Sequence, residues 1–210
     1  DAEIEEVVVK GKVLQSDQVN ALKTPTPIIN VPQSLTIVTD EEMLEKGMRS
    51  IGDIIRYTPG VNTSQGEGHR DAVVFRGVRS TADFFQDGAR DDVQYYRSLY
   101  NIEQVEILRG PNALLFGRGG TGGALNRVTK KAMVGDDFRT VNLGMDSFGA
   151  FDVAADINMD MGDTMALRIN VHSDTLENHR DYYEGDRLGF NPTLRMKLSS
   201  DTTLDLSYEH

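Results

Sequence analysis

Beyond Lys131 the chain alternates strictly between apolar and polar residues. From Phe151 to Asp160 the odd-numbered residues are all apolar, and the residues between them are Asp, Asn or Ala. Similar alternation runs through residues 141–145, 165–171, 190–198 and 204–208. A period of two residues is that of a β-strand with one apolar face. The sequence therefore predicts five strands, each with one apolar face and one charged or amide face.

A soluble sandwich would bury such apolar faces in its core, whereas a transmembrane barrel would turn them to lipid. The connections favour the barrel. Residues Met161–Thr164 and Ser199–Thr202 are predicted tight turns, and Ser173–Gly189 is predicted to be a long charged loop. Alternating short and long connections are typical of outer-membrane barrels. Five strands cannot close a barrel, so we expect these residues to begin a longer one.

Composition excludes several other classes of protein. Lys and Arg number 22 against 33 Asp and Glu, a net charge of −11 that opposes binding to a nucleic-acid backbone. The chain has no Cys, so disulfides, thiolate metal sites and iron–sulfur clusters are excluded. It also lacks the run of about 18 apolar residues that a spanning helix needs, so a helical membrane protein is excluded. Because of the negative net charge, nucleic acid is not an expected partner.

From Ser34 to Asn126, short helical and strand patterns alternate. Leu35–Val38 predicts a strand, followed by a helix capped at Thr39 or Asp40 and ending near Gly47. A second short helix is predicted over Ser50–Tyr57. Further strands are expected at residues 72–76, 84–87, 105–108 and 125–128. This region is predicted to be a small α+β domain.

The first residues, Asp1 to about Pro32, read as an extended, weakly ordered leader. The β-branched run Val7–Val9 is the exception. Such a run can add as a strand to the sheet edge of another protein, or it can be a frayed first strand. Composition does not separate these two interpretations.

Enzyme signatures are weak. Gly117–Gly122 has the spacing of a dinucleotide-binding loop, but the following residues Leu125–Thr129 are strand-like where that fold needs a helix. Tight turns and close backbone packing explain these glycines better. The four histidines lie in different segments without metal-ligand spacing. We therefore predict no catalytic residues and no protein-held metal.

Three polar stretches combine cations with aromatic or amide groups: residues 65–70, 79–81 and 90–97. Arginine forks and tyrosine rings can hold an anionic or aromatic ligand, although ordinary solvated loops have the same composition. Both interpretations stay open at this point.

Taken together, the chain resembles the plug domain of the TonB-dependent outer-membrane receptors, specifically the ferric-siderophore branch. The resemblance covers residues 5–131. It rests on an ordered set of segments: Val31–Ser34, Tyr57–Val61, Phe75–Gly77, Asp87–Arg90, Asn101–Glu106, Leu108–Pro111, Phe116–Gly119, Gly122–Asn126 and Thr129–Lys131.

This resemblance implies an α+β plug domain followed by antiparallel strands of a truncated 22-stranded transmembrane β-barrel. Residues 1–30 would be a flexible leader with the TonB box, 31–131 the plug domain, and 132–210 the first five or so barrel strands. Glu6, Val7, Val8 and Val9 look like the TonB box. The expected ligand contacts are His69, Arg70, Arg79, Gln94, Tyr95 and Tyr96.

The resemblance implies active import of a ferric-siderophore complex into the periplasm, powered by the inner-membrane TonB complex. The protein would be a monomer in outer-membrane lipid of a Gram-negative bacterium, with its plug inside the barrel lumen. It would be no enzyme and have no cofactor of its own, because iron arrives within the siderophore.

Several alternatives stay open. The cargo can instead be cobalamin, haem, another metal chelate or a glycan, and the protein can be a passive surface-binding pore. A nucleotide-dependent enzyme would rest on Gly117–Gly122 alone. Among siderophores, anionic catecholate complexes would suit Arg70, Arg79 and Arg90, and hydroxamates would suit Tyr95 and Tyr96. We lean to catecholates.

Overall fold

The computed structural model describes residues 18–20, 26–64, 70–80, 83–110 and 122–210. These residues divide into two compact units. The first contains residues up to 97 together with 103–128, and the second contains 98–102 together with 129–210. The predicted TonB box, His69 and most of the Gly117–Gly122 run lie outside the described residues.

The first unit begins with short elements: β1 (Gln18–Val19), β2 (Thr26–Pro27), a 3-10 helix (Ile28–Asn30) and β3 (Ser34–Thr39). Helix α1 spans Asp40–Glu45 and helix α2 spans Ile51–Arg56. The strands that follow are β4 (Val61–Thr63), β5 (Val73–Phe75), β6 (Val78–Ser80), β7 (Phe84–Gln86), β8 (Ala89–Arg90), β9 (Ile102–Arg109) and β10 (Gly123–Thr129). None of the helices in this described part is long and apolar enough to cross a membrane.

Both predicted helices are confirmed, and their caps explain where they begin. Thr39 accepts a hydrogen bond from the backbone of Glu42, and Ser50 forms a reciprocal capping box with Asp53. The apolar face of α2, formed by Ile51, Ile54 and Ile55, is buried as its spacing predicts.

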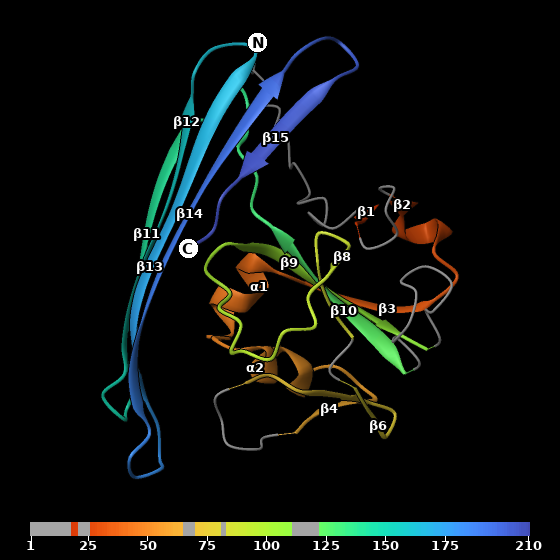
Figure 1. Cartoon of the computed structure of the whole chain (residues 1–210), viewed down its shortest axis with the longest axis vertical. Coiled ribbons are helices and arrows are strands. Elements are labelled where there is room, and N and C mark those ends of the chain that lie inside the picture. The colour runs from red at the N-terminus through yellow and green to blue at the C-terminus, as the bar shows by residue number, and fades with distance from the viewer. Residues whose placement is uncertain (1–17, 21–25, 65–69, 81–82, 111–121) are drawn as a thin grey trace, which may run out of the picture. The chain divides into compact units, whose positions relative to one another are not determined.

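A mixed sheet in the order β3-β9-β10-β7-β8 forms the centre of the first unit (Figure 1). Strand β10 is parallel to β7, and β3 is antiparallel to β9. One core cluster joins Val19, Phe85, Leu108 and Ala124. The strand at 125–128 is confirmed within β10, which leaves the glycine-rich run without the helix that a dinucleotide site needs. Strands β1, β2, β4, β6 and β8 were not predicted, because two or three residues are too few to show a period.

The first residue of β10, Gly123, lets this strand approach its neighbours closely. A Cβ on Gly123 would lie 2.5 Å from the Phe75 ring and 2.6 Å from the Leu108 carbonyl oxygen. We expect Gly123→Ala to destabilise the protein by about 2 kcal/mol, because the backbone of β9 cannot move aside. Calorimetric unfolding of the intact protein measures this. Gly185→Ala is the control, since its Cβ would meet Leu176 at an ordinary 3.6 Å. Equal melting of the two variants would contradict the close-packing argument.

The second unit is one antiparallel sheet in sequential order (Figure 1). Its strands are β11 (Phe138–Met145), β12 (Phe151–Asp160), β13 (Met165–Glu177), β14 (Glu184–Lys197) and β15 (Thr203–Ser207). The five predicted strands and the two predicted tight turns are confirmed, with Met165 closing one turn onto Gly162 and Ser199 closing the other onto Thr202. The residues 98–102 belong to this unit, where Tyr100 stacks on His172 with ring centroids 5.4 Å apart.

The prediction of a long loop over Ser173–Gly189 was wrong. Strand β13 continues to Glu177 and β14 starts at Glu184, so only residues 178–183 connect them. The two strands stay in register through these polar residues, and the cross-strand pair Asp174 and Arg187 forms an ion pair. Charged side chains that face each other across a ladder extend a sheet without any apolar signal.

The two faces of this sheet have the opposite burial to that of a soluble sandwich. On β13 the polar residues Arg168, Asn170, His172 and Asp174 are each exposed by 9% or less. On β11 the apolar residues Val141, Leu143 and Met145 are 64–78% exposed. The sheet therefore has one exposed apolar face and one polar face, as the strands of a receptor barrel would.

Candidate ligand-binding segment

The candidate site is built on residues 91–97, which follow the hairpin of β7 and β8. The hairpin turns at Asp87 and Gly88, both with positive φ (49° and 77°), which is the backbone of a tight primed turn. Directly after the hairpin, the Asp91 amide donates to the Phe84 carbonyl at 2.9 Å. The hairpin thus fixes where the segment starts.

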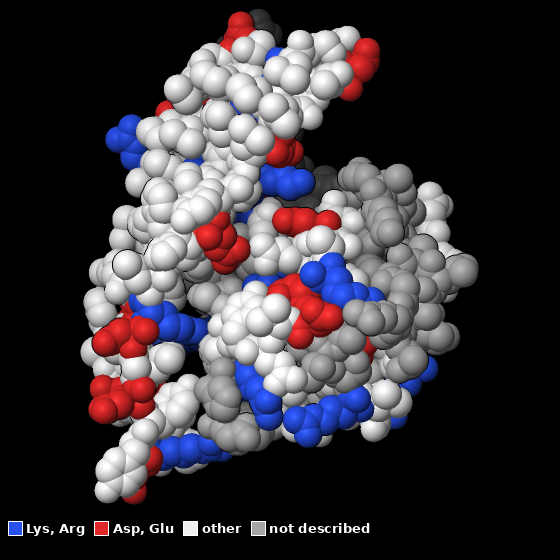
Figure 2. Space-filling model, in the orientation of Figure 1, with Lys and Arg blue, Asp and Glu red and all other residues white. Residues whose placement is uncertain are grey.

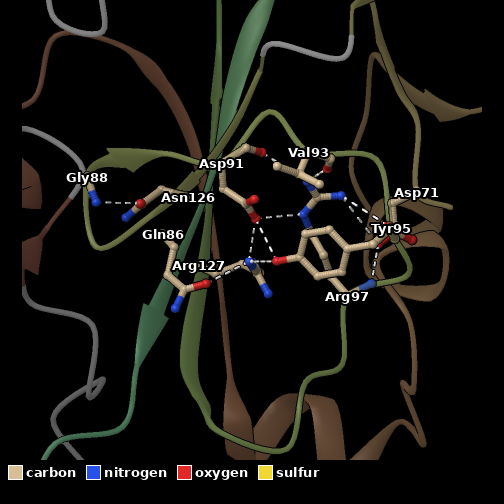
Figure 3. A network of polar contacts seen from close by, with 9 residues as sticks. All are labelled: Asp71, Gln86, Gly88, Asp91, Val93, Tyr95, Arg97, Asn126 and Arg127. Carbon is tan, nitrogen blue, oxygen red and sulfur yellow. Dashed lines mark hydrogen bonds and ion pairs between the residues drawn. The ribbon is translucent and has the colours of Figure 1, made fainter. Parts of the chain in front are cut away.

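Arg97 organises the segment from within (Figure 3). Its side chain is 1% exposed. The guanidinium donates to the Asp91 carboxylate at 3.0 Å and to the backbone carbonyls of Asp91, Val93 and Tyr95 at 2.9, 2.7 and 3.3 Å. It also lies over the rings of Phe84 and Tyr95, at 3.9 and 4.4 Å from their centroids. One buried guanidinium therefore binds the carbonyls of residues 91, 93 and 95, and the segment bends around it.

Arg127, from β10, supports the same carboxylate. Its Nη2 donates to Asp91 at 2.7 Å, to the Tyr95 hydroxyl at 2.8 Å and to Gln86 at 2.7 Å. The Tyr95 hydroxyl in turn donates to Asp91 at 2.8 Å. Burial raises the pKa of Tyr95, the nearby Arg127 lowers it, and the bond to Asp91 raises it again. Because the pKa of Tyr95 is raised from a value that is already alkaline, the hydroxyl is a donor at neutral pH.

Asp71, two residues before β5, ties the segment to that strand. Its carboxylate accepts from the Arg97 amide at 2.8 Å, and its own amide donates to the Tyr95 carbonyl at 3.1 Å. As a result Arg70 lies beside Gln94, and its guanidinium donates to the Gln94 amide oxygen. Arg70, Gln94 and Tyr95, three predicted ligand contacts from two separate stretches, are thereby brought together.

The other predicted residues are placed differently. Tyr96 is half-buried within the segment. Arg79 is exposed on β6, in the three-stranded sheet with β4 and β5, opposite Val74. His69, Glu6, Val7, Val8 and Val9 lie outside the described residues.

Sequence reasoning missed the residues that hold the site: Asp71, Asp91, Arg97 and Arg127. One signal was present, because an Asn and an Arg interrupt the strand Leu125–Val128. All seven residues of β10 are buried. A charged residue in a strand buried on both faces needs a partner, which points to a polar network.

The exposed surface of the segment offers mixed recognition groups. Val93, Gln94 and Tyr95 are exposed, next to the Arg70 guanidinium. Figure 2 shows basic and acidic side chains interspersed on the face in view, without one large patch of a single sign. Such a surface can hold a ligand through a few directed contacts with a cation, an amide and a phenol. Within the described residues, no group of His, Asp and Glu side chains is arranged to hold a metal ion.

Comparison with known proteins identifies both units. Residues 27–124 match the TonB-dependent receptor plug domain. The probable TonB-dependent receptor BfrD of Bordetella pertussis is 31% identical, over 97% of this chain and 28% of its own length. This chain thus spans little more than a quarter of that relative.

Solved structures agree. The siderophore receptor PiuA of Acinetobacter baumannii superposes with a TM-score of 0.83 at 26% identity, over 93% of this chain and 28% of that one. The closed form of the ferric-catecholate import receptor Fiu of Escherichia coli gives 0.83 at 25% identity, over 92% of this chain and 28% of that one. The similarity runs through the plug into the long strands. The chain belongs to the TonB-dependent receptor family, with a plug domain followed by antiparallel strands of the receptor barrel.

Proposed function

We propose that the receptor containing this chain is an outer-membrane active transporter, which binds a ferric siderophore from outside and imports it using energy from TonB. The observation that supports this most is the match to siderophore receptors over more than 90% of the chain, at a TM-score of 0.83. Iron enters as part of the cargo, so the protein needs neither a cofactor of its own nor catalytic residues.

Each part of the chain takes one role in this proposal. Residues 1–30 are the leader with the TonB box Glu6–Val9, residues 31–131 the plug within the barrel lumen, and residues 132–210 the first barrel strands. The exposed apolar residues of β11, such as Leu143 and Met145, favour contact with outer-membrane lipid. The working form is a monomer.

The proposed ligand contacts are His69, Arg70, Arg79, Gln94, Tyr95 and Tyr96. The geometry supports Arg70, Gln94 and Tyr95 as one cluster, because Arg70 donates to Gln94, and Arg97 and Arg127 hold the Tyr95 carbonyl and hydroxyl. A rigid segment loses little conformational entropy on binding. The guanidinium groups favour an anionic ferric catecholate as cargo.

Uptake of radiolabelled ferric siderophores by iron-starved cells carrying the complete receptor tests the function. We expect uptake of a catecholate complex in cells with TonB, and surface binding without uptake in cells lacking TonB. A hydroxamate panel is the matched comparison. Uptake that persists without TonB would indicate a passive pore, and no uptake of any panel member would place the cargo outside siderophores.

A further inference from the structure

A buried chain of hydrogen bonds runs from the N-terminal end of the described plug to the hairpin that carries the candidate site. The Asn20 amide donates to Glu106 Oε1 at 2.7 Å. The Asn126 side chain donates to Glu106 Oε2 at 3.0 Å, and its oxygen accepts from the Gly88 amide at 2.9 Å. We propose that Glu106 and Asn126 are positioning residues, which couple the N-terminal segment at residues 18–20 to the ligand-binding segment at residues 91–97.

The buried surroundings of these hydrogen bonds make the network rigid. Glu106, Asn126 and the neighbouring Val19 are all 0% exposed. Val19 packs in the core with Phe85 and Leu108, so residues 18–20 are held by packing and by Glu106 together. A buried carboxylate that loses a donor pays a desolvation cost, because water cannot replace the missing partner. Movement of Asn20 therefore displaces Glu106, and through Glu106 it displaces the next hydrogen-bond partner, Asn126.

Strand β10 carries the coupling onward through two adjacent residues. Side chains of consecutive strand residues point to opposite faces. Asn126 reaches Glu106 on one face. Figure 3 shows the bond from the Gly88 amide to Asn126, and the bonds of Arg127 to Asp91 and Tyr95 on the other face. A shift of β10 at this point alters both networks.

The Gly88 turn is the second connection. Strand β8 joins it directly to Asp91, the carboxylate that Arg97 and Arg127 share. Loss of the bond from the Gly88 amide to Asn126 frees the hairpin that fixes the start of the segment. Coupling between two sites is reciprocal. A pull on residues 18–20 therefore loosens the 91–97 segment, and an occupied segment changes the hold on Asn20.

Amide hydrogen exchange of the intact receptor, without siderophore, tests the coupling, since the Asn20 and Gly88 amides are themselves donors in the chain. In Asn126→Ala we expect exchange of both amides to be about tenfold faster, the effect of losing roughly one hydrogen bond of net stability. A purely local role would accelerate Gly88 alone. Asn158→Ala is the matched control, because Asn158 is an equally buried asparagine that donates to the Met133 and Asp136 carbonyls, so exchange of the Asn20 and Gly88 amides should stay as in the wild type.

If Asn126→Ala fails to fold, a deletion that leaves the core strands unchanged provides a second test. Removing residues 1–20 takes away Asn20 and should make the Gly88 amide and the 91–97 amides exchange about tenfold faster. Removing residues 1–12 keeps Val19 and Asn20 and should change nothing. Identical exchange in both deletions, or an unchanged Asn20 amide in Asn126→Ala, would overturn the coupling. The coupling deepens the proposed function, yet these measurements contain no cargo, so they are independent of which ligand the receptor imports.

Discussion

Replacing Arg97 with Met should release the candidate ligand-binding segment from the plug. The substitution removes four hydrogen bonds, to the Asp91 carboxylate and to the carbonyls of residues 91, 93 and 95. It takes a buried donor from the three carbonyls and one of its two cations from the Asp91 carboxylate, which keeps Arg127, and this costs about 3 kcal/mol or more. We expect the amides of residues 91–97 in the intact receptor to exchange roughly a hundredfold faster. We also expect siderophore affinity to fall, because the binding segment is no longer ordered.

Arg56→Met is the matched control for this substitution. Arg56 lies on α2, its side chain is 67% exposed, and its 3.7 Å ion pair with Asp53 faces solvent. An exposed pair of this kind contributes less than about 1 kcal/mol, so exchange in the segment should stay as in the wild type. If Arg97→Met were equally silent, the buried network would not be what orders the segment.

The contrast between these two arginines shows what the sequence could predict. Caps and periods are local, so the cap at Thr39 and the helix over Ser50–Tyr57 were predicted from neighbouring residues. The long strands were predicted for the same reason, since the alternation in β12 extends over its whole length. Arg56 and Arg97 carry the same side chain, and nothing local says that one is solvated and the other is 1% exposed.

What could not be predicted depends on partners distant in sequence. Arg127 bonds to Asp91 across 36 positions, and Asn20 to Glu106 across 86. The ends of β13 and β14 were missed because Asp174 and Arg187 stabilise each other across strands, not through a periodic apolar signal. The predicted contacts Arg70, Gln94 and Tyr95 are grouped by such long-range bonds, which is why composition could not separate ligand contacts from ordinary solvated loops.

Val8→Pro should abolish siderophore uptake and leave surface binding unchanged. If residues 6–9 pair as a strand with TonB, their backbone N–H groups carry the bonds through which force reaches the plug. Proline removes one donor and fixes φ, so it cannot take its place in such a ladder. We expect transport to drop to the level of cells lacking TonB, measured with the radiolabelled complex, while binding in the cold stays at the wild-type level.

Two controls separate this pairing from a general effect on the leader. Val8→Thr keeps the N–H group and the β-branched shape, so uptake should persist, because strand pairing uses the backbone. Ser16→Pro introduces the same ring outside residues 6–9 and before Asn20, and it should also be tolerated. Full uptake in Val8→Pro would remove residues 6–9 as the TonB box. Loss of uptake in all three variants would show instead that the whole leader, up to its attachment at Val19 and Asn20, has to keep its native backbone for force to reach Glu106.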